Sequence, residues 1–318
     1  MSRVLFLQTW RSQGLKMLIV FVALTIWSAL LPIVYGAFGK TFQDIIQSGL
    51  IPQQLTQFGG GDIFSLSGSI SLGAIHPISL ILNSVFAVGF ATAAVAGERQ
   101  RGTLEVLLAR PLSRRAIYVT LLVATLTFVA VAVLATILGA ILGSAVAGER
   151  QRGTLEVLLA RPLSRRATYV TLLVATLTFV AVAVLATIFG AILGSAIAGV
   201  LDQLAVDRLP LVWLNGFLLF SAIAAIGLAA SVSFDRLTPA LGITAGIVVV
   251  MYFLEVLGTF WPDAKGLQPY SLFHYYQPKE VLEGTAPVIN FVLPAVVAVV
   301  AVAWALVEFP RRDLAAPS

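Results

Sequence analysis

The feature that most constrains this chain is a series of long apolar runs. They lie at residues 17–38, 75–96, 116–147 (or its near-copy 167–199), 211–232, 239–258 and 288–307. A helix needs about 20 mostly apolar residues to cross the hydrocarbon core of a bilayer. Hydrophobic residues make up 59% of the chain and charged residues only 11%, which excludes both a soluble domain and a disordered chain. The predicted fold class is an all-α integral membrane protein.

A tandem repeat interrupts this series of runs. Residues 94–144 recur as residues 145–195, and the two 51-residue units differ only at Ile117/Thr168 and Leu138/Phe189. Each unit holds a charged, cytoplasmic-type loop followed by one apolar run. Solenoids need three or more stacked units, so this pattern indicates a recent duplication. We expect residues 1–318 to form a single transmembrane domain, a six-span bundle plus one extra apolar segment.

The positions of the charges predict the topology. With one repeat unit set aside, six spans with both termini in the cytoplasm place the arginine-rich loop, the turn at residues 235–236 and the pair Arg311 and Arg312 on the cytoplasmic side. This agrees with the preference of Lys and Arg for cytoplasmic loops. The chain is therefore predicted to be a multi-pass protein of the plasma or inner membrane, with a cytoplasmic N-terminus.

Two further features bear on the topology. Residues 1–16 alternate cationic and apolar side chains, which predicts an interfacial helix. If both repeat units spanned the membrane, seven spans would place one arginine-rich region outside. Three arrangements remain open: one copy lies beside the bundle, the run at 75–96 is displaced, or the repeat is an error of recombination or assembly.

Small residues within the apolar runs predict close packing between helices. They are Gly139, Ala140, Gly143, Gly227, Gly242 and Gly246.

The charged segment at residues 97–115 has the pattern of a short surface helix. Gly102 ends the preceding helix, Thr103 is a suitable N-cap, and Glu105 lies where the helix dipole favours an anion. The sequence Arg110-Pro111 ends the helix, because the residue before proline avoids helical angles. An amphipathic helix of this kind either transmits movement from a soluble partner or only anchors the loop.

The run GERQRGTLEVLLARPLSRR at residues 97–115 resembles the cytoplasmic loop of ABC-2 type transporter permeases, the membrane subunits of one class of ABC exporter. The segments IPQQL at 51–55, PYSLFHYY at 269–276 and FPRRDL at 309–314 agree with this resemblance. It implies a coupling helix that docks on a separate ABC ATP-binding subunit. It also implies a second permease subunit, in a homodimer or heterodimer. No nucleic-acid partner is expected, because an excess of Lys and Arg is ordinary on the cytoplasmic side of membrane spans.

The resemblance also implies which residues couple the permease to the ATPase. The family carries one such loop and this chain carries two, so the docking copy is left open. The implied residues are Glu98, Arg99, Gly102, Thr103, Leu104, Glu105, Leu108, Arg110 and Pro111 in the first unit, and Glu149, Arg150, Gly153, Thr154, Leu155, Glu156, Leu159, Arg161 and Pro162 in the second.

No catalytic, cofactor or metal site is expected. Residues 36–41 approach the phosphate-binding pattern Gly-x-x-x-x-Gly-Lys-Ser/Thr, but Val34 stands where the first glycine is needed. If transport is driven by ATP, the ATPase is therefore expected to be another chain. The two histidines, His76 and His274, are expected to be isolated interfacial residues, and Glu255, inside an apolar run, is expected to extend to the interface. A non-transport membrane scaffold or accessory protein and a secondary transporter remain alternative functions.

Overall fold

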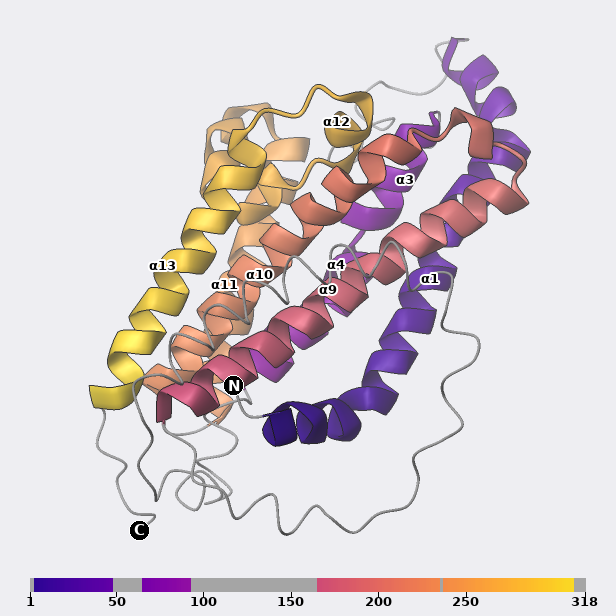
Figure 1. Ribbon diagram of the computed structural model, residues 1–318. Coiled ribbons are helices and arrows are strands. Elements are labelled where there is room, and N and C mark those ends of the chain that lie inside the picture. Colours follow the sequence, from indigo (N-terminus) through magenta and orange to yellow (C-terminus); the bar gives the residue numbers. More distant parts are fainter. Residues whose placement is uncertain (1–2, 48–64, 93–164, 235–236, 312–318) are drawn as a thin grey trace, which may run out of the picture.

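The computed structural model describes residues 3–47, 65–92, 165–234 and 237–311, whose regular secondary structure is helical throughout (Figure 1). Five helices among these residues are long and apolar enough to cross a membrane. A bent series of three shorter helices makes a sixth candidate span. The five long helices are α1 (Arg3–Gln47), α9 (Arg165–Ile197), α10 (Leu209–Ser233), α11 (Leu237–Phe260) and α13 (Ile289–Arg311).

The bent span consists of α3 (Leu66–Ile75), α4 (Pro77–Ser84) and the π-helical segment η1 (Val85–Phe90). It begins before the predicted run at 75–96, because Ser65 caps α3 by accepting a hydrogen bond from the Gly68 N–H at 3.0 Å. Pro77 has no N–H to continue α3, and the axes on the two sides of the break differ by 48°.

The second copy of the repeated run forms α9 and packs along α1. Gly190 and Gly194 of α9 face α1 so closely that an added Cβ would lie 2.8 Å from Ser28 Cβ and 2.7 Å from Ala29 Cα, respectively. Glycines four residues apart allow two helix backbones to approach in this way. The first copy of the run, residues 116–147, lies outside the described residues.

The spans alternate in direction, so the bundle has two distinct ends. The lower end in Figure 1 holds the beginnings of α1 and α9 and the end of α13. The first turns of α1 run across this lower end at a large angle to the rest of the helix (Figure 1), and Trp10 there stacks on Phe179 of α9 at 4.7 Å. The helix predicted within residues 1–16 is thus continuous with the first span.

The upper end holds the longer connections. Two 3-10 helices, η3 (Leu201–Gln203) and η4 (Val206–Arg208), join α9 to α10. Between α11 and α13 lie η5 (Pro262–Tyr270), η6 (Leu272–Tyr275) and α12 (Pro278–Glu283). We call residues 262–276 the cover segment. Helix α12 ends at Gly284, whose φ of 77° is left-handed and whose N–H bonds to two carbonyls of the last turn.

Candidate functional site

The predicted coupling residues, in the segments 98–111 and 149–162, lie outside the described residues. The structure does describe the two positions where this part of the chain joins the bundle. Thr92 follows η1, and Arg165 begins α9. The Ser231 hydroxyl of α10 donates to the Thr92 carbonyl at 2.8 Å, and the Thr92 hydroxyl donates to the Val88 carbonyl at 2.7 Å. The segment therefore leaves the second span beside the end of α10.

The helices at this junction are tightly packed. Tyr169, in the second turn of α9, has none of its surface exposed and belongs to the same core cluster as Val232 at the end of α10. The π-helical turn of η1 lies immediately before the junction, and such turns are frequent at functional sites. The described residues at this junction therefore belong to three packed elements: η1, α9 and the end of α10.

At the upper end, a buried amide connects α10 to the cover segment and to α13. The Asn215 side chain is fully buried, and its Nδ2 donates to the Tyr275 carbonyl at 2.9 Å and to the Asn290 carbonyl at 3.0 Å. Its Oδ1 accepts from the Gln277 N–H at 3.2 Å. Sequence reasoning missed Asn215 because it considered only ionisable side chains within the runs. The available signal was a single amide inside the run at 211–232.

Glu255 of α11 makes the second polar connection at this end. Its side chain is 13% exposed and lies against the cover segment, so it does not extend freely to the interface as expected. Gln268 Nε2 donates to Glu255 Oε1 at 3.2 Å, and His274 Nδ1 lies 3.7 Å from Glu255 Oε2. His274 is therefore not isolated. The described part of the chain has no group of three or more His, Cys, Asp or Glu that could hold a metal ion.

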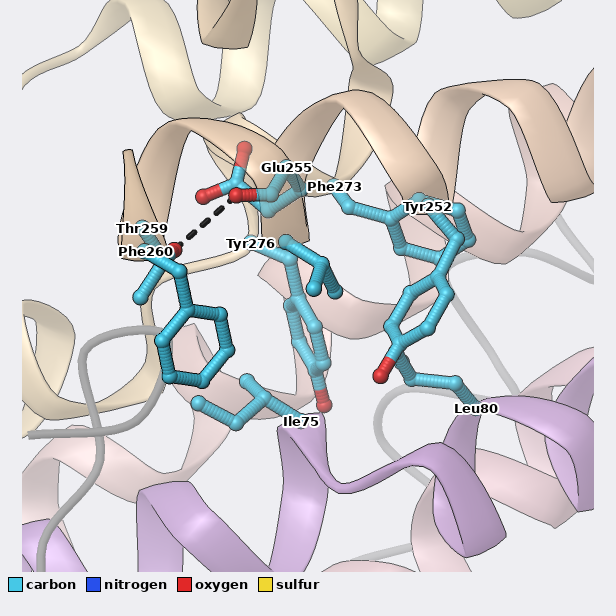
Figure 2. Close-up of a pocket in the computed structure, with 9 residues that line it drawn as sticks. Ile75, Leu80, Tyr252, Glu255, Thr259, Phe260, Phe273 and Tyr276 are labelled. Carbon is cyan, nitrogen blue, oxygen red and sulfur yellow. Dashed lines mark hydrogen bonds between the residues drawn. The ribbon is translucent and has the colours of Figure 1, made fainter. Parts of the chain in front are cut away.

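A small, partly open pocket lies between α11, η6 and the break between α3 and α4 (Figure 2). Aromatic and aliphatic side chains dominate its lining, which suits apolar rather than charged contents. Burial raises the pKa of the Tyr276 phenol, so this group stays neutral. The lining residues are Ile75, Leu80, Tyr252, Glu255, Val256, Thr259, Phe260, Phe273 and Tyr276.

In the described residues these features define a helical, multi-pass membrane protein whose upper end is closed by a cover segment held by buried polar contacts. Comparison with family models identifies it further. The model described as ABC-2 family transporter protein matches residues 6–146 and 137–314, and the two matches overlap where one repeat unit gives way to the next. The chain therefore belongs to the ABC-2 transporter family, as the resemblance of its loop predicted.

A search of curated proteins gave no significant match. Membership of the ABC-2 family makes the chain an ABC transporter permease in general terms. It also implies a membrane location and an ATP-binding subunit as partner.

Proposed function

We propose that this chain is the transmembrane permease subunit of an ATP-driven exporter. It works as a homodimer or heterodimer with ATP-binding subunits, in the plasma or inner membrane, and its N-terminus is cytoplasmic. ATP is hydrolysed on the partner subunit, and the chain itself has no catalytic site. The family match across residues 6–146 and 137–314 carries this proposal. The domain consists of six spans and one extra apolar segment from the duplicated unit.

The ATP-binding subunit docks on an arginine-rich loop at the lower end of the bundle. Support comes from the junction described above, where Thr92 and Tyr169 are both fully buried beside the end of α10. Packed elements transmit displacement because protein interiors are dense and deform little. Docking and release at the loop would thus tilt η1 and α9 relative to α10 and alternate access to the membrane interior.

The duplication offers an internal control for this proposal. Glu98 and Arg110 in the first unit correspond to Glu149 and Arg161 in the second, in identical local sequences. Only a docked copy forms contacts with the ATPase, so alanine substitutions in that copy reduce coupling. The same substitutions in the other copy leave it unchanged.

The test is co-purification of the permease with an ATP-binding subunit from its native membrane, followed by measurement of ATPase activity in reconstituted vesicles. The variant with all four residues replaced by alanine should insert normally but lose the bound ATPase subunit and the stimulated activity. One of the two double-alanine variants, altered in a single unit, should retain both. Normal coupling in the fourfold variant would refute the docking assignment, and failure of any ATPase to co-purify would favour a scaffold or a secondary transporter.

A further inference from the structure

Helix α11 depends on the cover segment for much of its packing. Only 11% of its apolar span is buried, against 72% for α10. Its last turns lie against η5, and Gly258 leaves the space that Gln268 occupies: an added Cβ would lie 2.7 Å from Gln268 Cδ. Gln268 is 8% exposed and also donates to the Glu255 carbonyl at 3.2 Å. The cover segment and the end of α11 therefore form one packed unit.

The ionisable pair within this unit is incompletely satisfied. Among the described residues, Glu255 Oε2 and His274 Nδ1 are buried atoms without a hydrogen-bond partner, and they lie 3.7 Å from each other; the His274 side chain as a whole is 37% exposed. Glu255 stands five residues before the end of α11, which is ~8 Å along the helix axis. A carboxylate at this depth is costly unless a positive charge accompanies it. An imidazolium at His274 supplies that charge, and a neutral imidazole does not.

We propose that Glu255, Gln268 and His274 form a proton-controlled latch. Protonated His274 holds the cover segment on α11, and deprotonation releases it. Release separates Phe273 of η6 from Tyr252 of α11, whose rings meet edge to face at 5.9 Å, and both residues line the pocket. The pocket is thereby closed at acidic pH and accessible at alkaline pH. This device goes beyond the exporter function proposed above and does not depend on ATPase coupling.

The figure and the surrounding groups agree with this assignment. Figure 2 shows the Glu255 carboxylate turned away from Ile75 and Leu80, on the side of α11 where Gln268 and His274 make their contacts. Tyr275 packs its ring edge-on against the His274 ring at 5.2 Å. The other titratable groups on the neighbouring elements are Tyr252 of α11, the exposed Asp263, Lys265 and Tyr270 of η5, Tyr276, and Lys279, Glu280 and Glu283 of α12.

The sign of the pH dependence follows from the charges. Histidine changes charge between about pH 5 and pH 8. Below that range, imidazolium and carboxylate attract each other across the latch. As the pH rises, the attraction is lost and the carboxylate remains without a cation, so the closed state loses population.

The experiment measures the separation of the cover segment from α11 by pulsed electron paramagnetic resonance. The chain contains no cysteine, so two spin labels can be placed cleanly at Gly266→Cys and Phe253→Cys. Gly266 has open space around it and Phe253 is 60% exposed. The purified full-length chain in lipid nanodiscs should give one short, narrow distance distribution at about pH 5 and a longer, broader one at about pH 8.

Three latch variants separate proton control from simple packing. Glu255→Gln and His274→Gln should give the broad distribution at both pH values. His274→Lys keeps a positive charge throughout and should give the narrow distribution at both. A merely structural histidine would not be replaced in this way by lysine. Thermal unfolding of each variant establishes that it is folded.

Two control variants remove other titratable groups. His76→Asn replaces the other histidine while keeping an acceptor for the Ile78 N–H, which bonds to His76 Nδ1 at 3.3 Å. Asp263→Asn removes an exposed acid of the same cover segment. Both controls should keep the pH dependence of the parent. Identical distributions of the parent at the two pH values, loss of the dependence in His76→Asn, or a broad distribution for His274→Lys would each overturn the latch.

Discussion

Helices α9 and α11 carry the same small-residue pattern and use it differently. Gly190 and Gly194 of α9 lie against Ser28 and Ala29 of α1, whereas Gly242 and Gly246 of α11 have no atom of the described chain within 4 Å of an added Cβ. About 67% of the α9 span is buried, against 11% of the α11 span. Glycine spacing thus predicts the ability to pack closely, and the partner surface decides whether that ability is used.

The difference extends to polar contacts. Central helices exchange hydrogen bonds with carbonyls of their neighbours: Trp213 Nε1 of α10 donates to the Ala181 carbonyl of α9 at 3.1 Å. Thr25 of α1 donates to the Ala186 carbonyl of α9 at 3.4 Å. Helix α11 instead meets its polar partners at its upper end, in the cover segment. The central helices form a packed framework, and α11 is a more exposed helix that packs on α10 and meets its polar partners at its upper end.

The largest effect is expected from Asn215→Leu in the central framework. The substitution leaves two buried carbonyls and the Gln277 N–H without their partner. Each such loss costs about 1–3 kcal/mol, so we expect a decrease of about 3–4 kcal/mol in the free energy of unfolding. Reversible denaturation of the purified protein in detergent micelles measures it.

A matched control is Asn83→Leu in α4. Asn83 is also buried, at 2% exposed, but within the described residues its Nδ2 bonds to the Ser79 carbonyl of the same helix. The expected decrease is below about 1.5 kcal/mol. Equal effects of the two substitutions would contradict the role of Asn215 in joining three elements.

A smaller effect is expected from Gly194→Ala in α9. The added methyl group would overlap the Ala29 backbone of α1, and overpacking of this kind costs about 1–3 kcal/mol. Thermal unfolding should show a lower midpoint than in the parent protein. Cross-linking of paired cysteines on α1 and α9 should become slower, because the two helices move apart.

The corresponding change in the more exposed helix α11, Gly246→Ala, tests the comparison directly. Open space surrounds Gly246, and alanine is the better helix former by up to about 1 kcal/mol. The unfolding midpoint should therefore stay level or rise slightly. A loss as large as that of Gly194→Ala would show that α11 has a close helical neighbour at this position after all.

The smallest effect is expected from deletion of residues 94–144. The second unit retains every residue of α9, including the glycine pair that the first unit duplicates as Gly139 and Gly143. We expect little change in the free energy of unfolding, because every residue that packs α9 in the bundle is retained. Deletion of residues 145–195 gives the same protein except at the two differing positions, so both deletions should unfold alike. Aggregation of both would mean that the bundle needs the additional unit.

The apolar runs predicted most of the helices correctly, and the errors have physical causes. Helix α3 was missed because residues 65–75 are rich in serine and glycine, and because Pro77 divides the span. A search for runs of apolar residues overlooks such a helix, because serine counts as polar even when its hydroxyl is buried. Ser69, for example, is buried and donates its hydroxyl to the Leu66 carbonyl at 2.9 Å. The extent of α9, α10, α11 and α13 followed closely from hydropathy.

The sites were less predictable than the spans. The arginine-rich segment could be identified because its residues are contiguous. The connection through Asn215 joins residues 60 and 75 positions apart in the sequence, and no local pattern reports such a pairing. The latch joins Glu255 to Gln268 and His274 by a turn of the cover segment. In the sequence, the latch was indicated by a single acidic residue, Glu255, in an apolar run. Only the tertiary structure showed which residues Glu255 contacts.

The sequence by itself determined that the chain is a membrane-spanning helical protein, that one 51-residue unit is duplicated, and that its charged loop belongs to the ABC-2 family. Only the tertiary structure decided which apolar helices are central, which glycines meet a neighbour and where the buried polar groups find partners. The physical reason is the solvent. Lipid and protein interior are similarly apolar, so the hydropathy of a span does not distinguish its lipid-facing side from its packed side.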